Sequence, residues 1–470
     1  MRKIIYMIFA ALTLSVSAYA QQNLRTAYFL DGYTYAYKFN PAFQGERGFL
    51  AIPVAGKVGV GLESSFALSS FLYPTADGGL TTFMNPSVSS ADFLGSLKEY
   101  NRTNINFDAP VFGLGFFTGE MYHTLDVSVR ADARLGLPKS LFSFMKEGAA
   151  NTDTWDMYNF GGRADARIEL AYGVSRRFYD FFNVGVRFKM LVGLINADLM
   201  IENLNLKMAA DEWSVGAKGY LNLNGIADLD DVDDLDSIDY PTTLEEVKNM
   251  NYSIGYALDL GMSVDFLNYF TASAAILDLG YIDWAQGFRA TTPADAEPWK
   301  FTGFDDIALK DAQTSLKSQL SSLGDDLMNV INLQEVNGYE PGRTDISATA
   351  HVGLEARMPF YEKLSFGLLG THRFDGPYSW TEGRASINIA PLKKFSASCS
   401  YAVSDFGNSV GAAVNLHSAF LTLFAGVDSF LPAMNLTPQY IPIDSWNTNL
   451  TVGLNFTVGA YRGHFPKIVF

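Results

Sequence analysis

The chain has 470 residues, a formal net charge of −16 and a single cysteine, Cys399. One cysteine excludes a fold held by internal disulfide bonds, and the acidic balance argues against nucleic acid or an anionic lipid surface as the main partner. Hydrophobic residues make up 48% of the chain, yet after the opening segment no apolar run approaches the roughly eighteen residues of a membrane helix. A helical membrane protein is therefore excluded, whereas a β-barrel is not, because its membrane-facing residues alternate with polar ones.

Residues 1–20 have the three parts of a secretory signal peptide. They combine a basic start at Arg2 and Lys3, an apolar core from Ile4 to Val16, and a small-residue cleavage site at Ala18-Tyr19-Ala20. Because Gln21 rather than a cysteine follows the cut, no lipid anchor is expected at the new N-terminus. We exclude this segment from the fold and expect a protein exported to the cell outer membrane.

The next segment, residues 21–47, carries tyrosines without regular alternation and then Asn40, Pro41 and Ala42. A proline cannot donate to a strand ladder, and it pushes the residue before it out of the helical region. We predict a non-strand N-terminal segment, followed by a barrel that occupies residues 48–470.

The clearest strand is residues 124–138, TLDVSVRADARLGLP, because its side chains divide into two faces. One parity is apolar and the other ionic, which is the pattern of an extended strand with a period of two. About eleven residues are enough to cross a bilayer as a tilted barrel strand. A strand of a soluble sandwich alternates in the same way. The rest of the chain must therefore distinguish a membrane barrel from a soluble sandwich.

The same division recurs in residues 163–174 and 184–192. We expect the apolar side chains to face lipid: Leu125, Val127, Val129, Ile168, Leu170, Val186 and Phe188. The candidate lumen-lining residues are Arg130, Asp132, Arg134, Asp165, Arg167, Glu169, Arg187 and Lys189. These ionic rows could line a polar pathway, or they could form a static network that fills the lumen, since charges removed from water must be paired.

Other segments with strand character are residues 48–64, 104–119, 195–208, 213–223, 252–265, 270–284, 345–357, 364–373, 380–390, 395–404, 408–417, 420–428 and 446–459. Short helices are predicted at residues 90–100 and after Pro138. Connections alternate between very short and very long, as in outer-membrane barrels, and we count about fourteen strands. A soluble sandwich of this length would normally divide into linked domains. The predicted fold is therefore all-β, a transmembrane antiparallel β-barrel.

Two long interruptions separate the strands. The first holds seven aspartates between Asp228 and Asp239; the EF-hand glycine and glutamate are missing from it, so a solvated acidic loop is predicted rather than a calcium site. The second, residues 285–344, carries apolar residues at three- and four-residue steps from Leu309 to Val330, which predicts an amphipathic helix in a long loop, packed as a cap or lid.

The motifs of enzymes and cofactor sites are weak in this sequence. Gly407, Ser409 and Gly411 match the spacing of a nucleophile elbow, but a strand continues after Ser409 where that motif needs a sharp turn and a helix. Five histidines are scattered without metal-ligand spacing: His123, His351, His372, His417 and His464. We therefore expect no enzyme, no metal and no cofactor.

Several segments resemble one family. They are Asn40-Pro41-Ala42, ELAYGVSRRFYDFFNVGVRFKMLVG from Glu169, ALDLGMSVDFLNYFTASAAILDLGYIDW from Ala257, and AGVDSFLP near the end. They resemble the DUF5723 outer-membrane proteins of Bacteroidota, which in turn are distantly similar to FadL and PorV barrels. The resemblance implies that Asn40, Pro41 and Ala42 belong to a hatch inside the barrel. The tail departs from the pattern. Outer-membrane barrels usually end their last strand on an aromatic residue, which is an insertion signal for the barrel-assembly machinery. Phe470 is such a residue, but Pro466 interrupts the strand before it.

Two functions of different class follow from this resemblance. The first is FadL-like passage of a small hydrophobic compound through a hatch-gated barrel. The alternative is a PorV-like barrel that binds or assembles with secreted proteins through its long loops and conducts nothing. Besides outer-membrane lipids, the expected partner is thus a small hydrophobic ligand or a secreted protein cargo, and not nucleic acid. Both functions need the same barrel and the same loops, so the sequence does not choose between them.

Overall fold

The computed structural model describes residues 24–52, 56–75, 79–148, 152–209, 212–225, 252–301, 333–336, 338–428 and 447–460. The signal peptide, the acidic stretch 228–239, the apolar stripe 309–330 and the tail that ends at Phe470 lie outside these residues. No described helix is long and apolar enough to cross a membrane.

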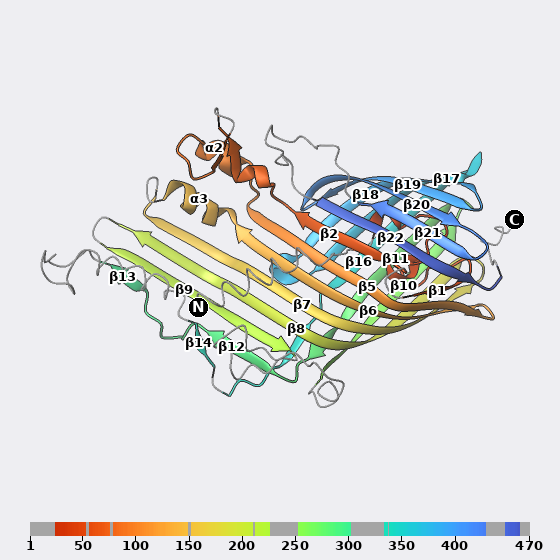
Figure 1. The fold of residues 1–470 in the computed structure, drawn as a ribbon, viewed down its shortest axis with the longest axis horizontal. Coiled ribbons are helices and arrows are strands. Elements are labelled where there is room, and N and C mark those ends of the chain that lie inside the picture. The colour runs from red at the N-terminus through yellow and green to blue at the C-terminus, as the bar shows by residue number, and fades with distance from the viewer. Residues whose placement is uncertain are drawn as a thin grey trace, which may run out of the picture.

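The described strands close into a barrel of fourteen antiparallel strands (Figure 1). In order around the wall they are β1 (Gly48–Ala51) with β2 (Val58–Ser64) as one interrupted strand, then β5 (Tyr100–Thr118), β6 (Met121–Pro138), β7 (Thr154–Phe178), β8 (Phe182–Met208), β10 (Ser253–Phe266), β11 (Phe270–Asp283), β16 (Ala348–Met358), β17 (Tyr361–Phe374), β18 (Trp380–Leu392), β19 (Phe395–Ser404), β20 (Gly407–His417), β21 (Leu421–Val427) and β22 (Asn447–Val458). β22 pairs with both β1 and β2, which closes the ring. The predicted fold class is confirmed.

Part of the sheet continues beyond the barrel. β7 and β8 run past the wall as a pair, and β8 also pairs with β9 (Trp213–Gly225). β9 in turn pairs with β12 (Gly287–Thr291) and β13 (Trp299–Phe301). β14 (Gln334–Glu335) pairs with β12, and β15 (Arg343–Asp345) pairs with β11. Figure 1 shows this extension at its left. Residues 213–223 therefore form a strand of the extension and not of the closed wall.

The prediction of two strands at residues 184–192 and 195–208 is wrong, because both belong to β8. Ala166 pairs with Ile195 and Arg167 with Gly193, so Leu194 is an extra residue in the ladder. Such a bulge exchanges the two faces of the strand. Apolar residues therefore change from one parity to the other at Leu194. In the sequence, this change of parity has the same appearance as the end of one strand and the start of another.

The two ends of the barrel differ. At one end short turns join neighbouring strands, at residues 119–120, 179–181, 267–269, 359–360, 393–394 and 418–420; we call this the short-turn rim. At the other end α2 (Ser90–Gly95), α3 (Lys139–Glu147) and the hairpin of β3 (Leu72–Pro74) and β4 (Leu80–Thr82) lie above the strands. Phe83, Phe93 and Phe142 pack together there.

Burial follows the alternation of the wall strands. On β6, Asp126 and Ser128 are fully buried inside the barrel, while Leu125, Val127 and Val129 on the other parity are partly exposed. On β7 and β8, Leu170, Val186 and Phe188 are exposed. The wall thus presents apolar side chains outward and polar side chains to the lumen.

We predict that the cost of an outward-facing charge depends on its position along a strand. Leu368 is an exposed residue at the middle of β17, and Tyr361 is an exposed residue at its end on the short-turn rim. If the wall lies in hydrocarbon, Leu368→Arg should cost about 2 to 4 kcal/mol, and Tyr361→Arg about 0 to 1 kcal/mol. Urea-dependent folding into phospholipid vesicles measures both. Equal costs would show that the wall is in water.

Candidate functional site

The short-turn half of the lumen is filled by residues 24–47, which we call the luminal segment. It contains no strand, only the single-turn helices η1 (Arg25–Ala27) and η2 (Ala36–Lys38). Its aromatic residues pack with wall residues in one buried cluster, which includes Tyr28, Tyr33, Tyr35, Tyr37, Phe39, Leu369, Ala413 and Phe424. This half of the barrel therefore contains an aromatic core.

The deep end of the luminal segment is fixed by Arg25. Its guanidinium lies 2.5 Å from Glu63 Oε1 and 2.8 Å from Glu382 Oε2, and it stacks over the Trp380 ring. The backbone N–H groups of Arg25 and Thr26 both donate to the Asp428 carboxylate, each at 2.6 Å. Hydrogen bonds of this charged kind are about twice as strong as neutral ones, so they hold this end to three parts of the wall.

Asn40, Pro41 and Ala42 lie buried against β8 and β10 inside the barrel. The Asn40 amide donates to Met262 O at 3.0 Å and to Ala274 O at 3.2 Å, which are partners across β10 and β11. Its Oδ1 accepts from the Ala42 N–H at 2.9 Å. A Cβ at Gly261 would lie 2.0 Å from Asn40 Oδ1, and one at Gly185 2.1 Å from Pro41 O. The motif therefore fits only because these two wall positions are glycines.

The middle of the lumen is filled by ion pairs. Among the described residues, nine cations and nine carboxylates join into one connected set. We call it the luminal ion network: Lys38, Lys57, Arg130, Arg134, Arg163, Arg167, Arg187, Lys189 and Arg373 with Asp108, Asp126, Asp132, Asp165, Glu169, Asp198, Asp259, Asp278 and Asp375. All eight candidate lumen-lining residues belong to it. Lys38 comes from the luminal segment, so the network also holds that segment to the wall.

The geometry of the network is close and interlocked. The Arg167 guanidinium lies 2.7 Å from Asp165 Oδ2 and 3.0 Å from Glu169 Oε1, and Arg187 lies 2.6 Å from Asp126 Oδ1. Removing one partner of a buried ion pair typically costs about 3 to 5 kcal/mol, because the other charge stays buried without compensation. A cavity between the network and the luminal segment, lined by Arg25, Asp108 and Arg130 among others, measures about 50 Å³. The arrangement is that of a static network rather than an open polar pathway.

Sequence reasoning missed about half of this site. It did not single out Asp126, Asp259 or Asp278, although Asp126 lies on the ionic parity of the clearest strand. It also missed Arg25 and its acceptors. A sequence feature that could have indicated a luminal segment is the series of inward-facing glycines on the wall strands. Gly185 and Gly261 lie beside the Asn-Pro-Ala motif, Gly367 lies beside Phe29, and Gly411 lies beside Thr26.

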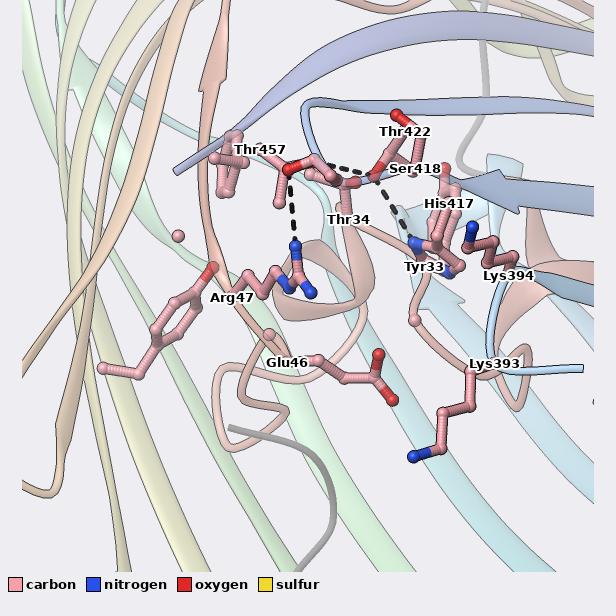
Figure 2. Close-up of a pocket in the computed structure, with 16 residues that line it drawn as sticks. Tyr33, Thr34, Glu46, Arg47, Lys393, Lys394, His417, Ser418, Thr422 and Thr457 are labelled. Atoms are coloured by element: carbon pink, nitrogen blue, oxygen red, sulfur yellow. Dashed lines mark hydrogen bonds between the residues drawn. The ribbon is translucent and has the colours of Figure 1, made fainter. Parts of the chain in front are cut away.

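Two cavities open beside the luminal segment at the short-turn rim. One measures about 370 Å³ and is lined by Arg47, Lys393, Lys394, His417 and Glu46, among others. Figure 2 shows these side chains around it, with Arg47 donating to Ala419 O at 3.4 Å. The other measures about 450 Å³, and its ionised lining is mostly acidic: Asp31, Glu46, Glu120, Asp180, Asp265 and Glu355 with Arg177 and Arg357. The rim is thus basic on one side of the segment and acidic on the other.

The backbone around Ser409 does not have the strand–turn–helix geometry of a nucleophile elbow. Ser409 is buried within β20, which continues to His417 without the required turn. In the described part of the chain, no three His, Cys, Asp or Glu side chains are placed to hold a metal ion. His351 and His372 are each within hydrogen-bond distance of a threonine on the neighbouring strand. These histidines lie on separate strands as polar wall residues.

We predict that a side chain at Gly261 displaces the Asn40 amide. Gly261→Val should lower the free energy of unfolding by about 1 to 3 kcal/mol, the usual cost of overpacking a filled interior. Gly383→Val is the matched control, because a Cβ there meets nothing within 4 Å. The heat-dependent loss of the folded form on a gel compares the two variants. If both melt like the unchanged protein, Asn40 does not pack against this wall.

The chain was compared with known proteins. Among solved structures, the chain is similar to a mutant of the monoaromatic hydrocarbon channel TodX, with 7% identity over 90% of this chain and 94% of that one and a TM-score of 0.43. It is also similar to the toluene transporter TbuX of Ralstonia pickettii (7%, 91% and 95%, 0.41), and to a Pseudomonas aeruginosa FadL homologue (11%, 88% and 90%, 0.35).

A family model gives the stronger result. None of the curated proteins matches the chain, but the model of DUF5723, a family of unknown function, matches residues 41–428. That match begins within the Asn-Pro-Ala motif and extends through the wall to Asp428. The chain belongs to the DUF5723 family.

Proposed function

We propose that the protein is an outer-membrane β-barrel that passes a small hydrophobic compound when its luminal segment moves. The placement is supported by the wall, whose described strands pair into a closed ring and whose outer side chains are apolar over most strands. Only closed barrels and helices satisfy their backbone groups in hydrocarbon. The short-turn rim then faces the periplasm, as it does in barrels of this kind.

One observation carries the transport proposal: the part that closes the lumen is separate from the wall. Residues 24–47 contribute no strand to the ladder and are held there by side-chain contacts, capping hydrogen bonds and ion pairs. Such contacts can be released without opening the barrel. The segment presents an aromatic surface, which suits a compound with little polar surface better than a hydrated ion.

The wall is interrupted beside this segment. Leu50 pairs with Phe456 and Val58 pairs with Val452. The first strand therefore uses eight residues over a length in which β22 uses four, so part of it is not paired in the ladder. Tyr35 lies on the lumen side of this interruption, and its hydroxyl donates to Asn455 Oδ1 on β22 at 3.0 Å. Movement of the luminal segment would break this contact, so we place the exit of an apolar compound beside it.

The alternative is a barrel that docks secreted proteins and conducts nothing. The luminal ion network supports it, because every member is paired and the cavity beside Arg25, Asp108 and Arg130 measures only about 50 Å³. The surface for such a partner would be the long-loop end, where residues 285–344 were predicted to form a cap and β9, β12 and β13 extend beyond the wall.

Loosening the deep end of the segment separates the two functions. Arg25→Ala removes the ion pairs to Glu63 and Glu382, so a transporter should show faster uptake of an uncharged aromatic dye by cells and higher conductance in planar bilayers. Arg343→Ala is the control, because its ion pair with Asp283 is exposed. Heat-modifiable gel migration confirms that each variant is folded.

If Arg25→Ala and a deletion of residues 24–46 leave both uptake and conductance unchanged in folded barrels, the transport proposal is wrong. Recovery of exported proteins from outer membranes, dependent on residues 285–344, would then favour docking.

A further inference from the structure

The most exposed large hydrophobic side chains of the described residues lie at the short-turn rim. They are Tyr179, Phe360, Phe420 and Leu267, which are 85%, 83%, 76% and 75% exposed. Each stands on a different turn, and Leu392 is similarly placed next to a fifth. Turn tips in water are usually small or polar, and exposed apolar groups of this size mark contact with a membrane or a partner.

These tips continue the apolar outer surface of the wall. Phe181 is exposed on the same turn as Tyr179, Phe266 is exposed at the end of β10 beside Leu267, and Leu416 and Leu423 are exposed on β20 and β21 next to the turn of Phe420. The apolar outer surface therefore continues onto these turn tips, beside exposed charged groups such as Arg176 and Glu120. This continuity favours lipid over a protein partner and places the rim at the level of the lipid headgroups.

One sector of this rim is basic. Lys393 and Lys394 form the exposed turn between β18 and β19, and Arg47 and His417 line the same 370 Å³ cavity (Figure 2). Lys363 lies nearby, since its ammonium donates to Pro391 O at 2.7 Å. Glu46 is the one carboxylate among the described residues that line this cavity. The other rim cavity is lined by six carboxylates. The positive charge is therefore confined to one sector of the rim.

The basic and the apolar groups share the same two turns. Leu392 directly precedes Lys393, and Phe420 follows Ser418 and Ala419, which also line the cavity. Arg47 joins these parts, because its guanidinium donates to the Ala419 carbonyl. Cations above apolar side chains at a membrane boundary are the arrangement that binds a lipid phosphate while its acyl chains stay in hydrocarbon.

We propose that the cavity lined by Arg47, Lys393, Lys394 and His417 binds the phosphate of a phospholipid from the leaflet that faces the short-turn rim. The proposal rests on the outer-membrane placement above but not on transport. The lysine ammonium groups and the Arg47 guanidinium donate to the phosphate oxygens, while Leu392 and Phe420 contact the chains. The mouth of the barrel, beside the luminal segment, would then carry a bound lipid.

Native mass spectrometry of the detergent-purified, delipidated protein tests this with phosphatidylglycerol and phosphatidylcholine as probes. We expect one phosphatidylglycerol to be retained in preference to phosphatidylcholine, and the double variant K393Q/K394Q to weaken that binding roughly tenfold or more, because each cation near an anionic headgroup contributes separately. The control K218Q/K300Q also removes two lysines, from the sheet extension at the other end, and should bind like the unchanged protein.

A second pair of variants separates lipid from a soluble anion. L392S/F420S keeps the basic groups, so it should weaken phosphatidylglycerol binding but not the binding of glycerol phosphate. Equal retention by K393Q/K394Q and its control would overturn the proposal. It would also fail if glycerol phosphate bound as tightly as the lipid. A protein that stays monomeric in water without detergent would instead refute the membrane placement itself.

Discussion

The pairing of charges inside the barrel is the constraint on which the rest of the structure depends. The luminal ion network joins β6, β7 and β8 to β10 and β11 through Arg130, Arg187 and Lys189, whose carboxylate partners include Asp259 and Asp278. Arg187 and Asp259 are register partners on neighbouring strands, whereas the pairs Arg134–Asp375 and Arg373–Asp132 join β6 to β17 and the turn after it. These last pairs form only when the wall is closed, so the network and the closed ladder stabilise one another. An incompletely closed wall would leave buried charges without partners, which is a large penalty.

The luminal segment depends on the same pairing. Lys38 lies 3.4 Å from Asp108 Oδ2 and 3.7 Å from Asp126 Oδ1, and both carboxylates also contact wall cations. Withdrawal of the segment would leave these carboxylates with Lys57 and Arg187 as partners, so the network stays partly compensated. At the deep end, however, Arg25 is bound by Glu63 and Glu382 together. Release of this deep end is therefore expected to limit movement of the segment, although two cavities already flank its short-turn end.

Alternation along single strands predicted the strands and their two faces, and the alternation of short and long connections predicted that they form a barrel. The parity of residues 124–138 correctly divided Asp126 and Ser128, which face the lumen, from Leu125 and Val127, which face outward. A barrel strand has one polar, lumen-facing side and one apolar, outward-facing side. The bulge at Leu194 defeated the same reasoning, since one extra residue exchanges the faces. The strand β9 also alternates, but alternation does not distinguish the barrel wall from a sheet that extends beyond it.

Partner identity could not be predicted in this way. Asp278 and Asp375 pair with Arg130 and Arg134, more than a hundred residues earlier in the chain, and nothing local in the sequence marks them as partners. The position of Asn40-Pro41-Ala42 came from a family resemblance, whereas the physical reason for it lies in Gly185 and Gly261 across the lumen. Long-range contacts of this kind depend on strand order and register, which alternation alone does not determine.

The central claim is that transport requires movement of the luminal segment within an intact wall. A disulfide tests it directly: a Cβ at Gly411 would lie 2.0 Å from Thr26 Oγ1, so Thr26→Cys with Gly411→Cys, in a Cys399→Ser background, can lock the segment to β20. Uptake of an uncharged aromatic dye is measured in the same cells before and after reduction. The account predicts that the oxidised barrel takes up no dye and that reduction restores uptake, whereas equal uptake in both states would contradict it.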